Sequence, residues 1–547
     1  MIMKMFCFLG FALLSCLQTS AQLLSSEHKF TKADSLRGSL RPERTAFDML
    51  KYDLNIQVMP KEKSIQGYNR ITFEVLEHQQ VMQLDLFDNM KIDSIVFQDK
   101  NLEFKREYNA FFIHFKNELQ SGSTEIIDVY YHGKPIIAKN PPWDGGFVFD
   151  QDSNENPWIA VAVQGTGASL WFPNKDHLSD EPDEVDIRIT VPKDLVAVSN
   201  GRLIDEIEVK EDLKTYYWQV TYPINNYNIT LNIGDYVHFS DQFQDLDLEY
   251  YVLRENLEKA KKHFEQVKPM MDCFYKKIGP YPFVRDSFKL VETPYLGMEH
   301  QSAVAYGNQY VNGYLGSDLS KTGYGLKFDF IIIHESGHEW FGNSISVKDI
   351  ADLWIHEGFT TYTEAIFVEC EYGKDAALDY IYGQRQLIQN KRPIIGEYGV
   401  NHEGSSDMYA KGSNIINTLR SLVDNDELWW KMLRDFTKEF AYQTTTTQEV
   451  VNFFSKALDK DLKAFFSQYL KYRDIPKLVF KTNNKNKNLE YKWNVDVEEF
   501  DMPLEIKVDG KSLWLFPKSS TWKTLEIKTG QVVDIDKKRF YIEVNFE

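Results

Sequence analysis

The sequence predicts an α+β multidomain fold, with an N-terminal antiparallel β domain, a mainly helical domain and a small C-terminal β-sandwich. Its 547 residues are too many for one hydrophobic core and are typical of roughly three or four domains. Alternation of apolar and polar residues dominates residues 50–240, a helical period dominates residues 250–470, and alternation returns after Pro476. The predicted parts are 1–21 as a signal peptide, 22–245 as the β domain, 246–475 as the helical domain and 476–547 as the sandwich.

The composition is that of a globular protein, with 43% hydrophobic and 26% charged residues. The 81 acidic side chains outnumber the 62 basic ones, which gives a formal net charge of −19. A chain this acidic repels phosphate backbones, so the composition argues against nucleic acid as a partner.

The first residues have the pattern of a secretory signal peptide. Lys4 precedes the apolar residues 5–17, and the small residues 19–21 supply a cleavage site. The apolar run is too short to span a bilayer comfortably. We expect cleavage after Ala21 and export to the periplasm or the extracellular space, with no transmembrane segment in the mature chain. Two alternatives stay open, a lipoprotein cysteine at Cys16 and a buried N-terminal helix.

Cysteine usage limits the covalent cross-links. Of the four cysteines, Cys7 and Cys16 lie in the predicted signal peptide, which leaves Cys273 and Cys370. The mature chain therefore has at most one internal disulfide and no disulfide framework. Whether these two cysteines pair stays open.

Short alternating segments predict the strands of the β domain. Residues 52–58, 70–75 and 186–191 alternate apolar and polar side chains, as strands with one buried face do. Turn residues separate such segments, for example Gly133-Lys134-Pro135 and Ser199-Asn200-Gly201. Regular short strands with such turns predict a large, mostly antiparallel sheet.

The period changes near residue 250, where residues 255–277 carry an apolar stripe at helical spacing. Beyond Pro476, alternating runs flank a polar turn at 483–488 and an Asp509-Gly510 hairpin signal, which predicts the sandwich. Further helices are predicted at 325–345, 355–371, 375–390, 411–424, 427–440 and 447–470.

The chemistry is concentrated in an HExxH sequence at residues 334–338, within the predicted helix 325–345. Residues i and i+4 project from one face of a helix, so His334 and His338 can bind one metal ion. Glu335 lies beside them, where it can act on a metal-bound water.

A catalytic zinc site needs a third protein ligand and one open position. The extended HExxHxxGxxH motif is absent, because Phe341 and Ser344 stand where it has glycine and histidine. Glu357 follows His338 after 18 intervening residues, on the next predicted helix, and is the candidate third ligand.

Two longer segments surround these residues, HEWFGN at 338–343 and LWIHEGFTTYTE at 353–364. With them the chain resembles the gluzincin zinc aminopeptidase family, which includes aminopeptidase N and leukotriene hydrolase. The resemblance covers about residues 50–475. It implies a saddle-shaped β domain, a thermolysin-like catalytic domain and the removal of N-terminal residues from peptides. Further matching segments are Ala197-Val198-Ser199-Asn200-Gly201, Gly279-Pro280-Tyr281-Pro282-Phe283, Gly297-Met298-Glu299 and Tyr409-Ala410-Lys411-Gly412.

The resemblance implies roles for individual residues. His334, His338 and Glu357 match the family's ligands for one Zn²⁺ ion, and Glu335 matches its general base. Tyr409 matches the tyrosine that stabilises the tetrahedral intermediate.

Substrate-binding residues follow from the same resemblance. Glu299 matches the glutamate that binds the free α-amine of the substrate, next to Gly297 and Met298 in one motif. The family's Gly-x-Met-Glu-Asn reads LGMEH at 296–300 here, so its first glycine and its final asparagine are changed. Gln164 aligns with an amine-contacting residue of the β domain.

The resulting hypothesis is a secreted zinc aminopeptidase that hydrolyses the N-terminal peptide bond of peptides with a free α-amine, with a zinc-activated water and Glu335 as general base. The alternatives are a zinc endopeptidase, against which Glu299 argues, and a catalytically silent peptide-binding protein on the same fold. Asp352 and Glu364 either orient zinc ligands or lie on a solvated helix face. Only about 70 residues follow Ile475, too few for a helical cap, so we expect an open cleft that accepts longer peptides.

Overall fold

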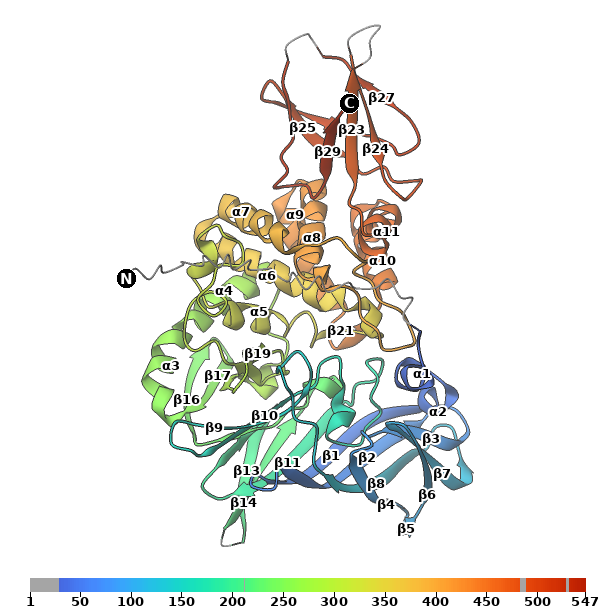
Figure 1. The fold of residues 1–547 in the computed structure, drawn as a ribbon, viewed down its shortest axis with the longest axis vertical. Helices are drawn as coiled ribbons and strands as arrows, with labels where there is room; N and C mark the ends of the chain where they lie inside the picture. The colour runs from blue at the N-terminus through green and yellow to red at the C-terminus, as the bar shows by residue number, and fades with distance from the viewer. Residues whose placement is uncertain (1–28, 211, 483–487, 528–530) are drawn as a thin grey trace, which may run out of the picture.

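The computed structural model describes residues 29–210, 212–482, 488–527 and 531–547, so the predicted signal peptide lies outside the described residues. Figure 1 shows strands of the N-terminal half at one end of the molecule, helices in the middle and C-terminal strands at the other end. This order of elements confirms the predicted α+β multidomain fold class. Within the described ranges, no helix combines the length and the apolarity needed to cross a bilayer.

An eight-stranded sheet forms the base of the molecule (Figure 1). Its strand order is β13-β14-β11-β1-β2-β8-β4-β5, and only β1 and β11 pair in parallel. The alternation predicted at 52–58 falls in β1, where Tyr52, Leu54, Ile56 and Val58 are buried. The bounds are β1 Phe47–Met59, β2 Ser64–Val75, β4 Met90–Phe97, β5 Lys100–Asn101, β8 Thr124–Gly133, β11 Glu184–Pro192, β13 Arg202–Lys210 and β14 Leu213–Val220.

Two smaller sheets complete the N-terminal half, with strand orders β3-β7-β6 and β12-β15-β10-β9. Two short helices, α1 (Lys32–Gly38) and α2 (Pro42–Thr45), precede β1. Gln164 lies in a turn that begins two residues after the end of β10, the third strand of the second of these sheets. The bounds are β3 Gln79–Asp85, β6 Glu103–Glu107, β7 Ala110–Leu119, β9 Gly146–Gln151, β10 Pro157–Ala162, β12 Val196–Val198 and β15 Asn232–Gly234.

A five-stranded sheet of order β16-β17-β18-β20-β19 leads into the helical region. Its edge strand β19 (Gly297–Met298) ends directly before Glu299. The other bounds are β16 Tyr236–Phe243, β17 Leu246–Leu253, β18 Phe288–Glu292 and β20 Val304–Tyr306. In the helical region, β21 (Ile345–Val347) pairs in parallel with β22 (Gln443–Thr445). The helices of this region are α3 Leu257–His263, α4 Val267–Lys277, α5 Phe330–Gly337, α6 Trp354–Tyr372, α7 Lys374–Gln384, α8 Ala410–Val423, α9 Asp426–Glu439, α10 Thr447–Leu458 and α11 Lys463–Lys471.

The prediction of one helix over 325–345 is wrong, because α5 spans only eight residues. It begins where the Asp329 side chain accepts hydrogen bonds from the backbone N–H groups of Ile331 and Ile332, at 2.9 and 3.2 Å, as a good N-cap does. It ends at Gly337, and His338 is the C-cap residue. A 3₁₀ turn at Tyr324–Leu326 precedes α5, and turns that lead into β21 follow it.

Two other predicted helices are interrupted. A 3₁₀ turn at Phe264–Gln266 separates α3 from α4 within 255–277, and the pattern at 447–470 is divided into α10 and α11. Asp459 ends α10 in the left-handed region with a φ of 49°, a conformation that stops a helix. Apolar periodicity continues across both breaks and therefore did not reveal them.

The described C-terminal residues form strands, as predicted. One four-stranded sheet has the order β27-β24-β23-β29 and one three-stranded sheet the order β26-β25-β28. In Figure 1 they lie beyond the helices, at the end of the molecule opposite the β domain. The bounds are β23 Lys477–Thr482, β24 Leu489–Asn494, β25 Leu504–Val508, β26 Lys511–Leu515, β27 Lys523–Leu525, β28 Val533–Asp534 and β29 Glu543–Phe546.

Candidate active site

Helices α5 and α6 bring together the three predicted metal ligands. His334 Nε2 lies 3.9 Å and His338 Nε2 lies 3.4 Å from the Oε2 atom of Glu357. Each of the three residues offers one ligand atom, and these three atoms all lie within 4.8 Å of one another. All three side chains are buried, so the cluster lies inside the protein and not on a solvated helix face.

Hydrogen bonds at the far side of each imidazole set its orientation. His334 Nδ1 donates to Glu364 Oε1 at 2.7 Å, and His338 Nδ1 donates to the carbonyl oxygen of Phe341 at 2.9 Å. In the neutral tautomer that makes these hydrogen bonds, the free nitrogen of each ring is the Nε2 atom on the side of the cluster, and this is the form that binds a metal.

Glu364 and Asp352 have different roles, which the sequence could not distinguish. Glu364 is fully buried and also accepts hydrogen bonds from Tyr380 Oη at 2.8 Å and Gln384 Nε2 at 2.7 Å. These contacts hold it against His334. Asp352 Oδ1 accepts a hydrogen bond from Tyr398 Oη at 2.6 Å and one from the Thr447 hydroxyl. Asp352 thus fastens a loop and does not orient a ligand.

The predicted amine-binding residues meet beside this cluster. Glu299 Oε1 accepts hydrogen bonds from Gln164 Nε2 at 2.6 Å and from Tyr227 Oη at 2.9 Å. Gln164 Nε2 also lies 3.3 Å from Glu357 Oε1, so one side chain of the β domain spans both groups. The backbone carbonyl of Glu299 accepts a hydrogen bond from Asn343 Nδ2 at 2.7 Å.

The remaining predicted residues also line the site. A Cβ on Gly297 would lie 2.9 Å from Glu335 Oε1 and 2.8 Å from Ile331 Cγ2, so this glycine gives the Glu335 carboxylate its space. Met298 is buried and lines the same cavity. The Tyr409 ring stacks on His334 with ring centroids 6.1 Å apart.

Burial and mutual repulsion shape the titration of the carboxylates. Burial raises the pKa of Glu335 to about 7, and burial also raises the pKa of Glu299. Burial acts in the same direction on Glu357, but the neighbouring His338 and His334 outweigh it and hold the pKa of Glu357 below its ordinary value. The carboxylate of the metal cluster is therefore the most readily ionised of the three.

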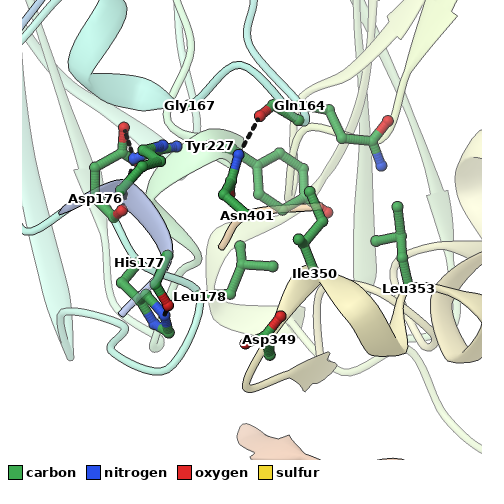
Figure 2. Close-up of a pocket in the computed structure, with 13 residues that line it drawn as sticks. Gln164, Gly167, Asp176, His177, Leu178, Tyr227, Asp349, Ile350, Leu353 and Asn401 are labelled. Carbon is green, nitrogen blue, oxygen red and sulfur yellow. Dashed lines mark hydrogen bonds and ion pairs between the residues drawn. The ribbon is translucent and has the colours of Figure 1, made fainter. Parts of the chain in front are cut away.

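These residues line one cavity of about 860 Å³ between the β domain and the helices. A second, much smaller pocket of about 30 Å³ shares Gln164 and Asn401 with this cavity as lining residues. Figure 2 shows this pocket, where Asn401 Nδ2 donates to the backbone oxygen of Gly165 at 3.2 Å. This contact fastens the turn that carries Gln164 to the helical region.

Two family models match the chain in series. The description "Peptidase M1 N-terminal domain" covers residues 49–227, and "Peptidase family M1 domain" covers residues 255–469. The chain belongs to peptidase family M1. The predicted resemblance to the gluzincin aminopeptidases is thereby confirmed.

Similar proteins carry aminopeptidase names. The leucyl aminopeptidase of Saccharolobus solfataricus is 20% identical over 84% of this chain and 59% of its own length. Probable aminopeptidase 2 of Sulfurisphaera tokodaii is 20% identical over 90% of this chain and 63% of its own length. The M1 chain thus spans about three-fifths of the relatives it matches.

A solved structure shares the fold. It is an M1 zinc metallopeptidase of Deinococcus radiodurans, a mutant bound to a Tyr-Ser-Ala substrate, with a TM-score of 0.65 and 19% identity. The match covers 80% of this chain and 98% of that one.

Membership of family M1 implies a zinc cofactor, and the residues present fit the ion. Glu357 Oε2 is buried and forms no hydrogen bond with any described residue, as expected for an atom reserved for a ligand. Two imidazole nitrogens and one carboxylate oxygen are donors that zinc prefers, and three protein ligands leave a position open. His334, His338 and Glu357 would hold the ion.

Sequence reasoning assigned no role to Tyr227 or Asn343, although both contact Glu299. Asn343 is the last residue of the HEWFGN segment, which begins with the metal-ligand candidate His338. Tyr227 lies in the polar run 225–228, which departs from strand alternation. That departure was the one signal available, because neither residue is near Glu299 in the chain.

Proposed function

We propose that this M1 protein is a zinc aminopeptidase that hydrolyses the N-terminal peptide bond of peptides with a free α-amine. The observation that carries the proposal is the shared contact of Gln164 Nε2 with Glu299 Oε1 and Glu357 Oε1, at 2.6 and 3.3 Å. An ammonium group bound by Glu299 would then lie within one residue length of the metal ligands. The aminopeptidase names of the relatives support the same activity.

Recognition of the substrate rests on the charge of its first residue. Glu299 is buried with polar partners on several sides, so a charge-assisted hydrogen bond between its carboxylate and an ammonium group would be strong. A blocked N-terminus would leave this carboxylate without a cationic partner, and such losses are costly in a buried site. The pocket therefore selects the first peptide bond.

Zinc, when bound, activates a water molecule and polarises the scissile carbonyl group. Glu335 accepts the proton of the attacking water and delivers it to the leaving amine, as a general base and then a general acid. Gly297 leaves the space in which this carboxylate moves.

Tyr409 keeps its phenolic proton, because burial raises its pKa well above the ordinary value. It can therefore donate a hydrogen bond to the oxyanion that develops on the carbonyl oxygen. Its ring stacks on His334, which supports this role because it places Tyr409 beside a metal ligand.

The test compares a short free peptide with its N-acetylated twin, using zinc-loaded wild type and Glu299→Ala. We expect cleavage of the free peptide alone, with kcat/KM about 10²-fold lower in Glu299→Ala because the substrate is no longer positioned. Glu265→Ala, which removes an exposed carboxylate outside the cavity, is the matched control and should behave as wild type.

Two outcomes would contradict this proposal. Equal cleavage of both peptides would favour the endopeptidase alternative. No cleavage of either peptide across a panel of N-terminal residues, despite one zinc ion per chain, would favour a peptide-binding protein.

We also propose that the chain is exported after removal of residues 1–21. The charge and apolar pattern of those residues supports this, and so does the disulfide between Cys273 and Cys370, a cross-link typical of oxidising compartments. Sequencing of the protein recovered outside the cytoplasm should give Gln22 as its first residue. Retention of Met1 would contradict the proposal.

A further inference from the structure

A further cavity lies where the helical region meets the C-terminal strands. It has a volume of about 520 Å³ and is lined by three segments of the chain, the loop at 320–321, the last turn of α7 with the turn after it, and residues between 537 and 542. It shares no lining residue with the active-site cavity. The proposed mechanism therefore gives it no role.

The charge of this cavity is opposite to that of the chain. Lys321, Arg385 and Lys537 line it, and none of the described residues that line it is acidic. The chain as a whole carries a formal net charge of −19. Three cations gathered in an acidic protein create a local positive potential that attracts small anions, whereas the rest of the surface repels long polyanions.

Arg385 is held in place but lacks an acidic partner. Its Nε donates to Asn414 Oδ1 at 2.6 Å, and its guanidinium lies 5.0 and 4.9 Å from the ring centroids of Tyr382 and Tyr541. Its Nη2 atom is buried and forms no hydrogen bond with any described residue. Burial lowers the pKa of Arg385 to about 10, so the group stays charged at neutral pH. A largely buried cation without a counter-ion is costly, and a bound anion offsets that cost.

The walls of the cavity are fixed by contacts within the protein. A Cβ on Gly383 would lie 2.1 Å from the carbonyl oxygen of Ser320, so α7 packs closely against the loop that carries Lys321. In the C-terminal segment, Tyr541 Oη accepts a hydrogen bond from Asn390 Nδ2 at 3.0 Å. The cations are thus brought together by the fold itself.

We propose that this cavity binds a phosphate group, which Arg385 holds and Lys321 and Lys537 help to neutralise. A planar guanidinium offers N–H donors in a fork that matches phosphate oxygens, and lysine adds a point charge. The rings of Tyr382 and Tyr541 offer apolar contact to the organic part of a phosphate ester. We therefore expect an ester to bind more tightly than inorganic phosphate. This site is separate from peptide cleavage and does not depend on the proposed function.

The test measures the Kd values of inorganic phosphate and phenyl phosphate with the zinc-loaded protein by isothermal titration calorimetry. We expect Arg385→Gln to raise the Kd of phenyl phosphate about tenfold or more, because charged hydrogen bonds are lost. Lys537→Gln removes an exposed cation and should raise it about threefold. Lys262→Gln is the matched control for Lys537→Gln, because it removes the same charge from an exposed residue that does not line the cavity.

The outcomes are distinct from those of the cleavage assay. Lys537 does not line the active-site cavity, so Lys537→Gln should cleave peptides as wild type does, and loss of the proposed activity would leave this inference standing. If Arg385→Gln fails to fold, the comparison of Lys537→Gln with Lys262→Gln still decides.

Tighter binding of phenyl phosphate would identify an ester as the ligand, and equal Kd values for the two probes would identify inorganic phosphate. The inference is overturned if wild type binds neither probe at millimolar concentration, or if Lys537→Gln leaves both Kd values unchanged. Equal weakening by Lys537→Gln and Lys262→Gln would also overturn it, because binding would then follow the net charge of the chain.

Discussion

Single side chains in this protein act through partners that lie far away in the chain. Glu364 belongs to α6, yet its carboxylate accepts the Nδ1 proton of His334 in α5. A carboxylate behind a ligating imidazole fixes the tautomer and raises the basicity of the ligand. Tyr380 and Gln384 of α7 hold that carboxylate in turn, so three helices cooperate in orienting one ligand.

We predict that Glu364→Ala weakens zinc binding about 10- to 100-fold, because His334 loses its orienting partner. The measurement is competition with a chelator of known zinc affinity. Asp352→Ala removes a buried carboxylate from the same region, but Asp352 contacts no ligand, so its zinc affinity should match that of wild type. Equal weakening in both variants would show that buried charge, and not the contact with His334, supports the site.

At the scale of secondary-structure elements, helix α6 connects the active site to the rest of the fold. It carries Glu357 and Glu364 on its buried side, and the disulfide Cys273–Cys370 links its last turn to α4 across a sequence separation of 97 residues. A cross-link that closes a long loop restricts the unfolded chain. The disulfide therefore stabilises the folded state, in which α4 and the ligand-bearing α6 are linked.

We predict that the double variant Cys273→Ser and Cys370→Ser lowers the free energy of unfolding by about 2–5 kcal/mol. Denaturant unfolding measures this value. A reductant should lower the stability of wild type towards that of the double variant and leave the double variant unchanged. If the reductant destabilised both proteins equally, the disulfide would not be the cause.

At the scale of the whole molecule, a hydrogen bond and an ion pair attach helix α1 to the β domain. His177 Nε2 donates to the backbone oxygen of Gly38 at 3.2 Å, while its Nδ1 accepts from the backbone N–H of Ser179 at 3.1 Å. The neutral imidazole satisfies both contacts, and burial lowers the pKa of His177 to about 3. Arg37 in the same helix forms an ion pair with Asp176 at 2.5 Å.

A pH dependence of stability follows from His177. In the unfolded chain a histidine takes up a proton near pH 6.5, whereas His177 stays neutral in the fold down to about pH 3. The unfolded state therefore binds more protons in this window. We predict that stability is full above pH 6.5 and falls by up to about 1.4 kcal/mol per pH unit as the pH drops towards 3.

Urea unfolding at several pH values checks this prediction. His177→Gln should reduce the slope, because glutamine does not titrate. His78→Gln, in an exposed position, should leave the slope unchanged. An identical slope in wild type and His177→Gln would assign the acid sensitivity to other groups.

The cavity belongs to the junction of the β domain and the helices. Its lining residues run from Pro142 to Ala410, and the described strands after residue 476 lie at the far end of the molecule (Figure 1). Acceptance of longer peptides through an open cleft stays a prediction.

The sequence by itself determined what depends on local spacing. His334 and His338 are one helical turn apart, so their shared face follows from the geometry of α5, and strand alternation in β1 follows from one buried face. Family motifs added Glu357, Glu299 and Tyr409, which the fold brings into one cavity.

Only the tertiary structure decided what depends on contacts between distant segments. Tyr227 reaches Glu299 from another domain, and Trp143 reaches the cavity from a turn that carries no motif. Which of Glu364 and Asp352 orients a metal ligand likewise depends on which carboxylate lies against His334, and that carboxylate is Glu364. Helix ends at Gly337 and Asp459 were missed because apolar spacing reports burial, whereas capping and turn contacts decide where a helix stops.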